Sequence, residues 1–423
     1  MNRLGWITVF GLLIGACGGG DDDDDTAVGD GDADSDADAD ADADGDSDAD
    51  GDADGDADGD ADACPVEDLQ ASLDGLLEDG VPGVTGAVHL AGGCRWAGAA
   101  GEADRETGTP MAAGTPLRIG SITKSFTAAV ILQLVEEGVL GLDDTVETWF
   151  PELPNAEVIT VRMLLSHTSG VPEFAGLPEA LVPETGAWGE PVLSPEQIVG
   201  LVSAEEPTAP PGDLCSYSNT NFIMLGLIVE ERTGSTWAGE VRARLLDPLG
   251  LEHTFIEGSE TIPADAATGY WYEQIVRLDP ETGEAVRTNE IAEAPDPGGA
   301  WSWAAGSLVS TSEDLVRWAE AVFGGEVLGP ELTEAMVTPA RLNDGSPALL
   351  YGSMGYGFGI LIEDGDDGRF FFHNGAVPGF TAFFGFDPDR GLALGTALNL
   401  YDGLYSQSSG LNLRWAPYDP AER

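Results

Sequence analysis

Residues 18–63 restrict what this chain can fold into more than any other segment. They alternate aspartate with alanine, glycine and serine, and they contain 22 aspartates but no lysine or arginine. Such a segment has too little apolar surface to offset the entropy lost on ordering, and its charges repel one another. We therefore predict that residues 18–63 form a disordered, extended linker and that folding is confined to residues 64–423, as one domain.

The charge of the chain limits its partners. The 423 residues carry a formal net charge of −59, and without the 22 linker aspartates and Arg3 the remaining residues 64–423 still carry −38. Because binding to nucleic acid needs basic side chains that contact phosphates, no nucleic-acid partner is expected. The linker leaves two interpretations open. It is either a solvated spacer or a weak calcium binder, since DSDADG at 46–51 places oxygen ligands at every second position, as an EF-hand loop does at its start.

The first 17 residues have the pattern of an export signal. Arg3 precedes an apolar stretch from Leu4 to Ile14 that is too short to span a bilayer as a stable helix. The sequence IGAC at 14–17 resembles the lipobox of bacterial lipoproteins, which implies cleavage before Cys17 and lipid on its sulfur. An ordinary secretory signal is the alternative. Residues 1–17 are thus predicted to be a signal peptide with its lipobox, and the protein is expected in the bacterial cell envelope, anchored to a membrane by lipid.

An exported location permits disulfides. With Cys17 lipidated, three cysteines remain. Sequence separation and compartment suggest that Cys64 and Cys94 link the start of the domain to an early strand, but the sequence does not settle the disulfide connectivity. Cys215 would then be the odd thiol. The cysteines and the four histidines match no zinc-binding spacing, so neither a metal nor another cofactor is predicted.

Strand patterns occur at both ends of residues 64–423, and helical patterns occur between them. Strands are predicted at 84–91, 95–101, 356–362, 369–374, 379–386 and 391–399, with a hairpin-type turn at 387–391. Helices are predicted at 69–77, 121–138, 160–166, 219–233, 236–246 and 312–323. The simplest arrangement is an α+β fold. Both chain ends build one central antiparallel sheet, helices flank it, and a mostly helical lobe is inserted.

Lys124 is the only lysine in a chain that has 16 arginines. It follows Ser121 by three residues, so both side chains lie on one face of the first turn of the helix predicted at 121–138. A serine hydroxyl becomes a good nucleophile when a base takes its proton, and a neutral lysine can be that base, whereas an arginine cannot. Burial and the positive end of the helix dipole both lower the pKa of a lysine. The pair is therefore a candidate nucleophile and base.

Two further segments complete a pattern. Tyr-Ser-Asn at 217–219 comes just before a predicted helix, and His-Asn-Gly at 373–375 lies on a predicted edge strand. Ser-x-x-Lys, Tyr-x-Asn and His-x-Gly, in this order, resemble the class C branch of the serine β-lactamase and penicillin-binding-protein superfamily. That branch includes D,D-carboxypeptidases, D-aminopeptidases and esterases. The flanking segments PLRIGSITKSFTA, LLSHTSGVPEF and AAGSLVSTSEDLVRW look similar too, and the resemblance covers roughly residues 66–400.

The resemblance implies the β-lactamase/transpeptidase-like fold and a catalytic role for three residues. Ser121 would be the acylated nucleophile and Lys124 its proton acceptor. Tyr217 would share or relay that proton and protonate the leaving group. Without the resemblance, Tyr217 could equally be a packed tyrosine.

The resemblance also implies a set of binding residues. Asn219 would hydrogen-bond both the lysine and the substrate, and His373 and Gly375 would line the strand on which the substrate docks. The backbone N–H groups of Ser121 and Ala376 would form the oxyanion hole. Taken alone, Asn219 is also a suitable helix N-cap, and His373 is also compatible with a strand residue whose side chain is satisfied internally.

Three residues near these motifs have other interpretations. His167 precedes Thr-Ser-Gly in a loop that ends a helix, and we interpret it as structural. Trp301 and Trp303 either wall the pocket or pack in the core.

The third motif guides the choice of substrate. β-Lactamases usually have a lysine where this chain has His373, and a histidine that is mostly neutral near pH 7 attracts an anionic β-lactam less strongly. The resemblance therefore implies a serine hydrolase that acts through an acyl-enzyme on an ester or on a D-amino-acid amide or peptide. The alternatives are a D,D-carboxypeptidase or class C-like β-lactamase and, in another class, a non-catalytic envelope binding protein with the same fold.

Overall fold

The computed structural model of the chain describes residues 64–177, 193–278, 285–294, 302–365 and 368–401. The predicted signal peptide with Cys17, the predicted linker at 18–63 and Trp301 lie outside these ranges. Within the ranges, no helix is both long enough and apolar enough to cross a membrane.

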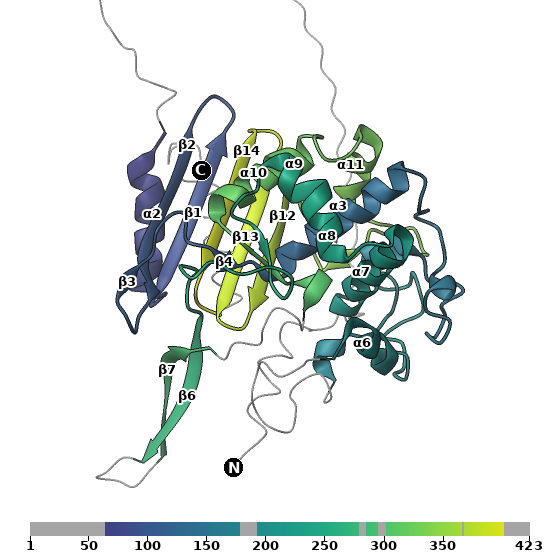
Figure 1. Cartoon of the computed structure of the whole chain (residues 1–423), viewed down its shortest axis with the longest axis horizontal. Coiled ribbons are helices and arrows are strands. Elements are labelled where there is room, and N and C mark those ends of the chain that lie inside the picture. The colour runs from purple at the N-terminus through teal and green to yellow at the C-terminus, as the bar shows by residue number, and fades with distance from the viewer. Residues whose placement is uncertain (1–63, 178–192, 279–284, 295–301, 366–367, 402–423) are drawn as a thin grey trace, which may run out of the picture. The chain divides into compact units, whose positions relative to one another are not determined.

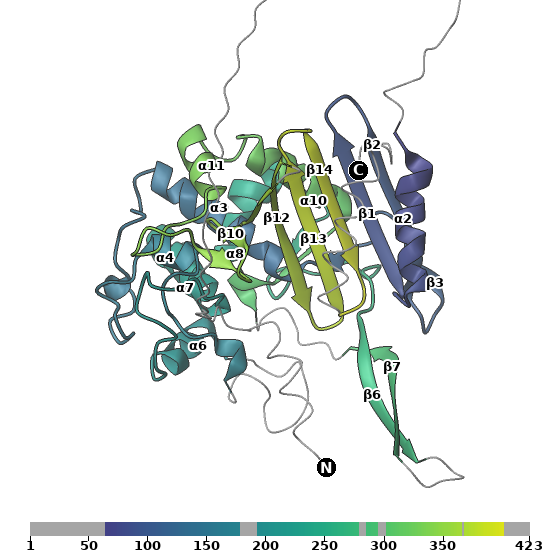
Figure 2. The same ribbon diagram turned by 180° about the vertical axis from the view of Figure 1, so that it is seen from behind.

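A nine-stranded sheet is built from both ends of the described chain, as Figures 1 and 2 show. Its strand order is β3-β2-β1-β14-β13-β12-β11-β10-β9, and neighbouring strands are antiparallel. The N-terminal strands are β1 (Gly83–Leu90), β2 (Arg95–Asp104) and β3 (Thr109–Pro110). The C-terminal strands are β9 (Leu349–Leu350), β10 (Met354–Tyr356), β11 (Leu361–Gly365), β12 (Gly368–Val377), β13 (Phe380–Asp387) and β14 (Leu392–Leu398). Because β1 pairs with β14, the predicted sheet from both chain ends is confirmed.

Apolar clusters cover both faces of the sheet. Successive side chains of a strand point to opposite faces, so neighbouring residues of one strand enter different clusters. Phe370 and Phe372 of β12 belong to one apolar cluster, together with Leu69 of helix α2 (Val66–Glu78). Phe371 and β14 residue Ala393 belong to the other cluster, which continues into the helical lobe. This arrangement explains why the C-terminal strands are apolar almost throughout rather than at alternate positions.

Helices form the second layer and the inserted lobe (Figure 1). Helix α10 (Ser312–Phe323) packs on β14 and β1, and Gly395 allows this approach, because a Cβ there would lie 2.7 Å from the Ser312 carbonyl oxygen. The other α-helices among the described residues are α3 (Thr123–Glu136), α4 (Val161–Leu165), α6 (Pro195–Val202), α7 (Asn219–Thr233), α8 (Trp237–Val241), α9 (Asp247–Leu249) and α11 (Pro330–Met336). The helix predicted at 236–246 is α8 continued by the π-helical turn η4 (Arg242–Leu246).

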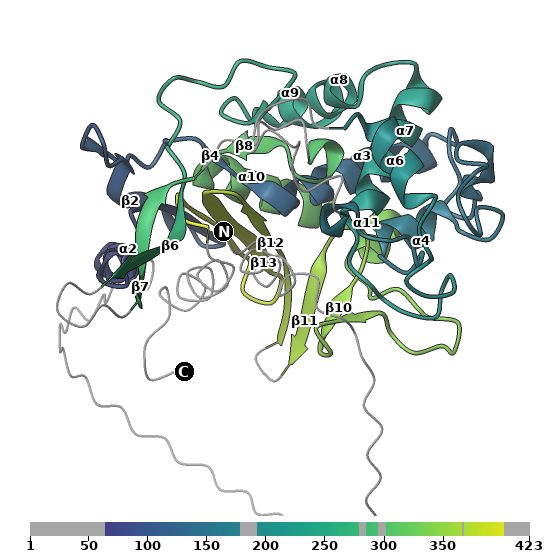
Figure 3. The same cartoon turned by 90° about the horizontal axis from the view of Figure 1, so that it is seen from below.

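One predicted strand is wrong. The segment 356–362 is interrupted, since β10 ends at Tyr356 and β11 begins at Leu361 (Figure 3). Between them the backbone bonds to helix ends rather than to a strand: Gly359 N–H donates to Leu165 O over 3.2 Å. Gly359 also has a φ of 73°, a conformation that L side chains rarely adopt, so the chain turns there. A periodicity of apolar residues cannot reveal such a turn.

Two smaller sheets were not predicted. A three-stranded sheet has the order β4-β8-β5, from β4 (Leu117–Arg118), β8 (Leu308–Ser310) and β5 (Phe255–Ile256). A hairpin of β6 (Tyr270–Leu278) and β7 (Ala285–Glu293) extends away from the large sheet (Figures 1 and 2). The short strands of the first sheet are too brief to give a periodic signal.

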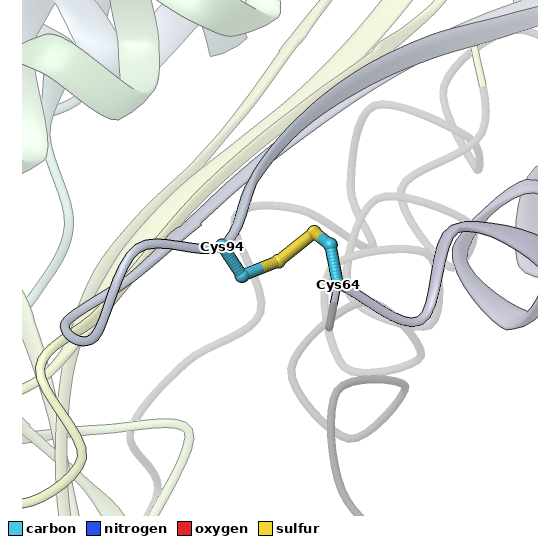
Figure 4. The surroundings of a disulfide bond; sticks show 2 residues. All are labelled: Cys64 and Cys94. Atoms are coloured by element: carbon cyan, nitrogen blue, oxygen red, sulfur yellow. A yellow bond between two sulfur atoms is a disulfide. The ribbon is translucent and has the colours of Figure 1, made fainter. Parts of the chain in front are cut away.

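The predicted disulfide between Cys64 and Cys94 is present (Figure 4). Their Cα atoms lie 4.8 Å apart, within the range that a disulfide spans. The bond ties Cys64, two residues before α2, to Cys94, which directly precedes β2. Cys215 is a buried thiol in the same apolar cluster as Phe370 and Phe372, with its sulfur 3.8 Å from Ser166 O.

Candidate active site

The Ser121–Lys124 pair lies at the start of α3. Ser121 is in the 3₁₀ turn η1 (Gly120–Ile122), so the helix predicted from residue 121 becomes α-helical at Thr123. The Lys124 side chain is completely buried and its Nζ lies 2.9 Å from Ser121 Oγ. Nζ also lies 2.7 Å from Asn219 Oδ1 and 2.8 Å from Ala305 O. Three oxygens from three separate elements therefore converge on one amine.

These contacts fit a neutral lysine that acts as a base. The Asn219 amide oxygen and the Ala305 carbonyl can only accept hydrogen bonds, so they take two N–H groups of Lys124. The Ser121 hydroxyl can donate as well as accept. In a neutral amine, the lone pair that remains is thus directed at the serine proton.

Burial supports the neutral form. Loss of solvation lowers the pKa of Lys124 to about 7, against an opposing effect of the Glu173 charge. A lysine with this pKa is a base near neutral pH, whereas an ordinary surface lysine is protonated.

Tyr217 and Asn219 reach the amine from the start of α7. Nζ of Lys124 lies 4.9 Å from the centre of the Tyr217 phenol ring, and the Ser121 side chain is close enough to that phenol to influence its pKa. Burial raises the pKa of Tyr217 well above its ordinary value, so the phenol keeps its proton. The helix N-cap position belongs to Ser218, and Asn219 is the first helical residue. The alternative interpretation of Asn219 as an N-cap is therefore wrong, because its side chain binds Lys124 instead.

Glu173 is a member of this cluster that sequence reasoning missed. It precedes the turn η3 (Phe174–Gly176) and is partly buried. Its carboxylate accepts a hydrogen bond from the Asn219 side-chain amide at 3.2 Å and another from Asn219 N–H. The signal in the sequence is an acidic residue within the apolar segment GVPEFAG. In a chain with so many carboxylates, this signal does not single out Glu173.

Strand β12 forms the opposite wall. Residues 368–372 pair with β11, whereas among the described strands residues 373–377 pair only with β13. The predicted edge is therefore real over the second half of the strand. That half contacts η1: a Cβ on Gly375 would overlap the Ile119 carbonyl oxygen, and a Cβ on Gly120 would lie 2.9 Å from Ala376 N. Two glycines thus bring the backbone of Ser121 and of Ala376 together.

His373 is 2 % exposed and satisfied within the protein. Its Nδ1 lies 2.5 Å from Asn374 O and therefore carries the proton, and its Nε2 accepts from the Tyr356 hydroxyl at 3.1 Å. Burial, followed by the nearby Lys124 charge, lowers the pKa of His373 to about 3. The ring is thus neutral, as expected from the sequence, and it supports the strand from behind, while Asn374 and Ala376 are the partly exposed residues.

His167 packs behind the tyrosine. Its ring centre is 4.4 Å from that of Tyr217, and its Nδ1 accepts from Ser218 N–H at 3.2 Å. These contacts agree with the structural interpretation. Trp303 packs edge-on against Trp237, with ring centres 5.7 Å apart, and belongs to the large apolar cluster, as the core-packing alternative requires.

Comparison with known proteins agrees with this geometry. The family model described as Beta-lactamase matches residues 26–407. Penicillin-binding protein 4* of Bacillus subtilis is 27 % identical over 289 residues, which cover 66 % of this chain and 60 % of that protein. Penicillin-binding protein 4 of Amycolatopsis lactamdurans is 27 % identical over 356 residues, 79 % of this chain and 86 % of that protein.

Solved structures show the same likeness. The D-amino acid amidase of Ochrobactrum anthropi SV3, complexed with D-phenylalanine, superposes with a TM-score of 0.72 at 29 % identity, over 83 % of this chain and 98 % of that one. The penicillin-binding protein of Bacillus halodurans gives a TM-score of 0.65 at 26 % identity, over 81 % and 99 %. The chain therefore belongs to the β-lactamase family and to the superfamily of β-lactamase-like serine hydrolases. It spans about 60 % of the length of the first relative named above.

Proposed function

We propose that this protein hydrolyses an ester or a D-amino-acid amide or peptide through an acyl-enzyme on Ser121. The observation that carries the proposal is the Lys124 amine, buried and in contact with the Ser121 hydroxyl and two obligate acceptors. Lys124 takes the hydroxyl proton as Ser121 Oγ attacks the substrate carbonyl. The oxygen that becomes negative is stabilised by the N–H groups of Ser121 and Ala376.

The second half of the reaction uses the same groups. The proton held by Lys124 passes through the Tyr217 phenol to the leaving amine or alcohol, and the bond from the carbonyl carbon to that group breaks. Water then attacks the carbonyl carbon of the ester on Ser121 and gives a proton to Lys124. The bond from that carbon to Ser121 Oγ breaks, Lys124 returns the proton to Oγ, and the acid leaves. Asn219 holds the lysine and the substrate, and the substrate lies along the open edge of β12 beside Gly375.

The neutral, buried His373 favours amide and ester substrates over β-lactams. No positive side chain from the third motif meets a substrate carboxylate, and the D-amino acid amidase is a relative with a similar fold. A D,D-carboxypeptidase or class C-like β-lactamase is the second candidate, because several relatives are penicillin-binding proteins. A non-catalytic envelope binding protein remains as the alternative of another class.

The intact mass of the protein tests the proposal. The wild type and Ser121→Ala are mixed with D-phenylalanine methyl ester, the matching L-ester and benzylpenicillin. We expect turnover of the D-ester with a transient acyl adduct in the wild type and neither in Ser121→Ala. A lasting benzylpenicillin adduct would favour the carboxypeptidase, and no reaction with any probe would leave the binding protein as the better account.

We further propose that the protein is a lipoprotein of the bacterial cell envelope, held at a membrane by lipid on Cys17. The support is the IGAC sequence at 14–17. Fractionation of cells tests it: the wild type should partition with membranes and Cys17→Ala should not.

Residues 18–63 are proposed to be a spacer between that anchor and the folded domain, with weak calcium binding as a second property. The support is the density of aspartates. Calorimetric titration with calcium should give heat for the full chain that is lost when the linker aspartates are replaced by asparagine.

A further inference from the structure

Glu173 lies against the catalytic cluster without a step of the reaction assigned to it. Its carboxylate accepts from three N–H groups: Ala175 N–H at 2.9 Å, the Asn219 side-chain amide at 3.2 Å and Asn219 N–H. The loop that carries it is fixed to α7 as well, because Thr220 Oγ1 donates to Pro172 O at 2.7 Å and accepts from Phe174 N–H at 3.0 Å. The carboxylate is therefore held in one place.

The contacts favour an ionised carboxylate. Each of the three groups is a donor, and a protonated acid would need an acceptor for its own O–H. The start of α7 adds the positive end of a helix dipole. On balance the pKa of Glu173 is raised, because burial outweighs these donors and the Lys124 charge. The three donors are therefore the geometric reason for assigning the ionised form.

An ionised Glu173 decides which way the Asn219 amide points. A carboxylate only accepts hydrogen bonds, so Nδ2 of Asn219 must face Glu173 and Oδ1 must face Lys124. With Oδ1 and the Ala305 carbonyl each taking an N–H, the Lys124 lone pair has Ser121 as its remaining partner. If the amide turned over, Nδ2 would donate to the lone pair and block the base.

We propose that Glu173 is a positioning residue: it fixes the Asn219 amide so that the Lys124 lone pair points at Ser121, and its negative charge sets the pH at which that lone pair becomes available. The expected effect of Glu173 on hydrolysis rests on the proposed function, whereas its effect on the Asn219 amide and on the Lys124 titration does not. The geometry of the three side chains stands apart from the identity of the substrate.

Four titratable side chains face Lys124 from the packed elements. They are Glu173 before η3, Tyr217 before α7, His167 after α4 and His373 on β12. Burial raises the pKa of Tyr217 and lowers the pKa of both histidines, so these three groups are neutral near pH 7. Among the described residues, Glu173 is thus the charged group in this set, and removing its charge has a predictable sign.

The single lysine of the chain makes the test direct. Protein labelled with ¹³C at the lysine Cε gives one lysine resonance, and its pH titration reports Lys124 without assignment. We expect the wild type to titrate near pH 7 and Glu173→Gln to titrate lower by about one unit or more, since an opposite charge within reach shifts a pKa by ~1–3 units. Glu152→Gln, an equal charge change at an exposed position, should leave the titration unchanged.

Glu173→Asp separates the charge from the shape of the side chain. It keeps the carboxylate, so the Lys124 titration should stay within about half a unit of the wild type even if the shorter side chain weakens the contacts. An unchanged titration in Glu173→Gln, or an equal shift in Glu173→Asp and Glu173→Gln, would overturn the proposal. A cooperative thermal unfolding transition in each variant shows that the variant is folded.

Activity supplies the second readout. Above pH 8 Lys124 is neutral in both proteins. A loss of kcat/KM that remains there in Glu173→Gln therefore reports the turned Asn219 amide and not the Lys124 pKa. We expect kcat/KM to be lower than in the wild type by about 10- to 100-fold. Equal kcat/KM above pH 8 would reject the positioning half of the proposal. A wild type that hydrolyses no probe, yet shows the expected titrations, would reject the proposed function and leave the Glu173 effect standing.

Discussion

The two walls of the active site are built by different means. On the helical side, Lys124, Asn219 and Glu173 form a chain of side-chain hydrogen bonds, and the acid–base chemistry is concentrated there. On the sheet side, β12 offers backbone held in place by close contact of Gly375 with Ile119. Under the proposed function, the helical wall would move protons and the sheet wall would stabilise charge on the substrate. A substitution on one wall should then leave the measured property of the other wall unchanged.

The two walls also differ in the charge of their titratable side chains. The helical wall holds the Glu173 carboxylate and the Lys124 amine on the two ends of the Asn219 amide, whereas His373 of the sheet wall is neutral and internally bonded. The pH dependence of the enzyme should therefore originate in the helical wall.

The largest effect is expected from Lys124→Arg. The guanidinium keeps the positive charge but cannot lose its proton, so the helical wall would lose its base. We expect the rate of acylation to fall by at least about 10³-fold. The measurement is the single-turnover rate with the D-ester, and a loss of less than tenfold would show that Lys124 is not the base.

Gly375→Ala should damage the sheet wall alone. Its Cβ would overlap the Ile119 carbonyl oxygen, so β12 must move away from η1 and the two N–H groups of the oxyanion hole must separate. We expect kcat to fall by about 10²-fold while the ¹³C titration of Lys124 stays the same. Gly365→Ala, where a Cβ would meet nothing within 4 Å, is the matched control. A shifted titration in Gly375→Ala would mean that the two walls are not separable.

The pH profile gives a third test, with a defined sign. Lys124 must be neutral to accept the serine proton, so kcat/KM should rise with pH through about 7, the pKa of Lys124. His373, with its pKa lowered to about 3, should add no step between pH 5 and 8. His373→Asn should therefore keep the midpoint of the rise even if it lowers the rate, and loss of the rise in that variant would assign it to the histidine.

The sequence predicted the helical wall better than the sheet wall. Ser121, Lys124 and Tyr217 carry distinctive side chains at recognisable spacings, and the structure brings them together. The contact between β12 and η1 depends on glycines and on strand register, neither of which leaves a distinctive side-chain pattern. The fold was predictable at the level of one sheet from both ends, because the C-terminal strands are strongly apolar.

Two misses have the same physical cause. Glu173 acts through a hydrogen bond to a residue 46 positions away, and the break between β10 and β11 depends on contacts of Gly359 with α3 and α4. Local periodicity reports the burial of a segment, not its partners. Long-range partners become visible only in the folded chain.

The smallest effect on catalysis is expected from breaking the disulfide. Cys94 directly precedes β2, and β1, β14 and β13 lie between β2 and β12 in the sheet. The bond closes a loop with a sequence separation of 30 residues. Its loss should release chain entropy in the unfolded state and lower the free energy of unfolding by about 3.6 kcal/mol. Chemical denaturation of Cys94→Ser measures this. Its kcat/KM below the unfolding transition should stay within about twofold of the wild type, because β12, α3 and α7 do not depend on the bond. A large loss of kcat/KM with intact folding would show that the N-terminal strands affect the sheet wall through β1, β14 and β13. The position of β12 would then depend on the disulfide, and the two walls would differ in what stabilises them as well as in their chemistry.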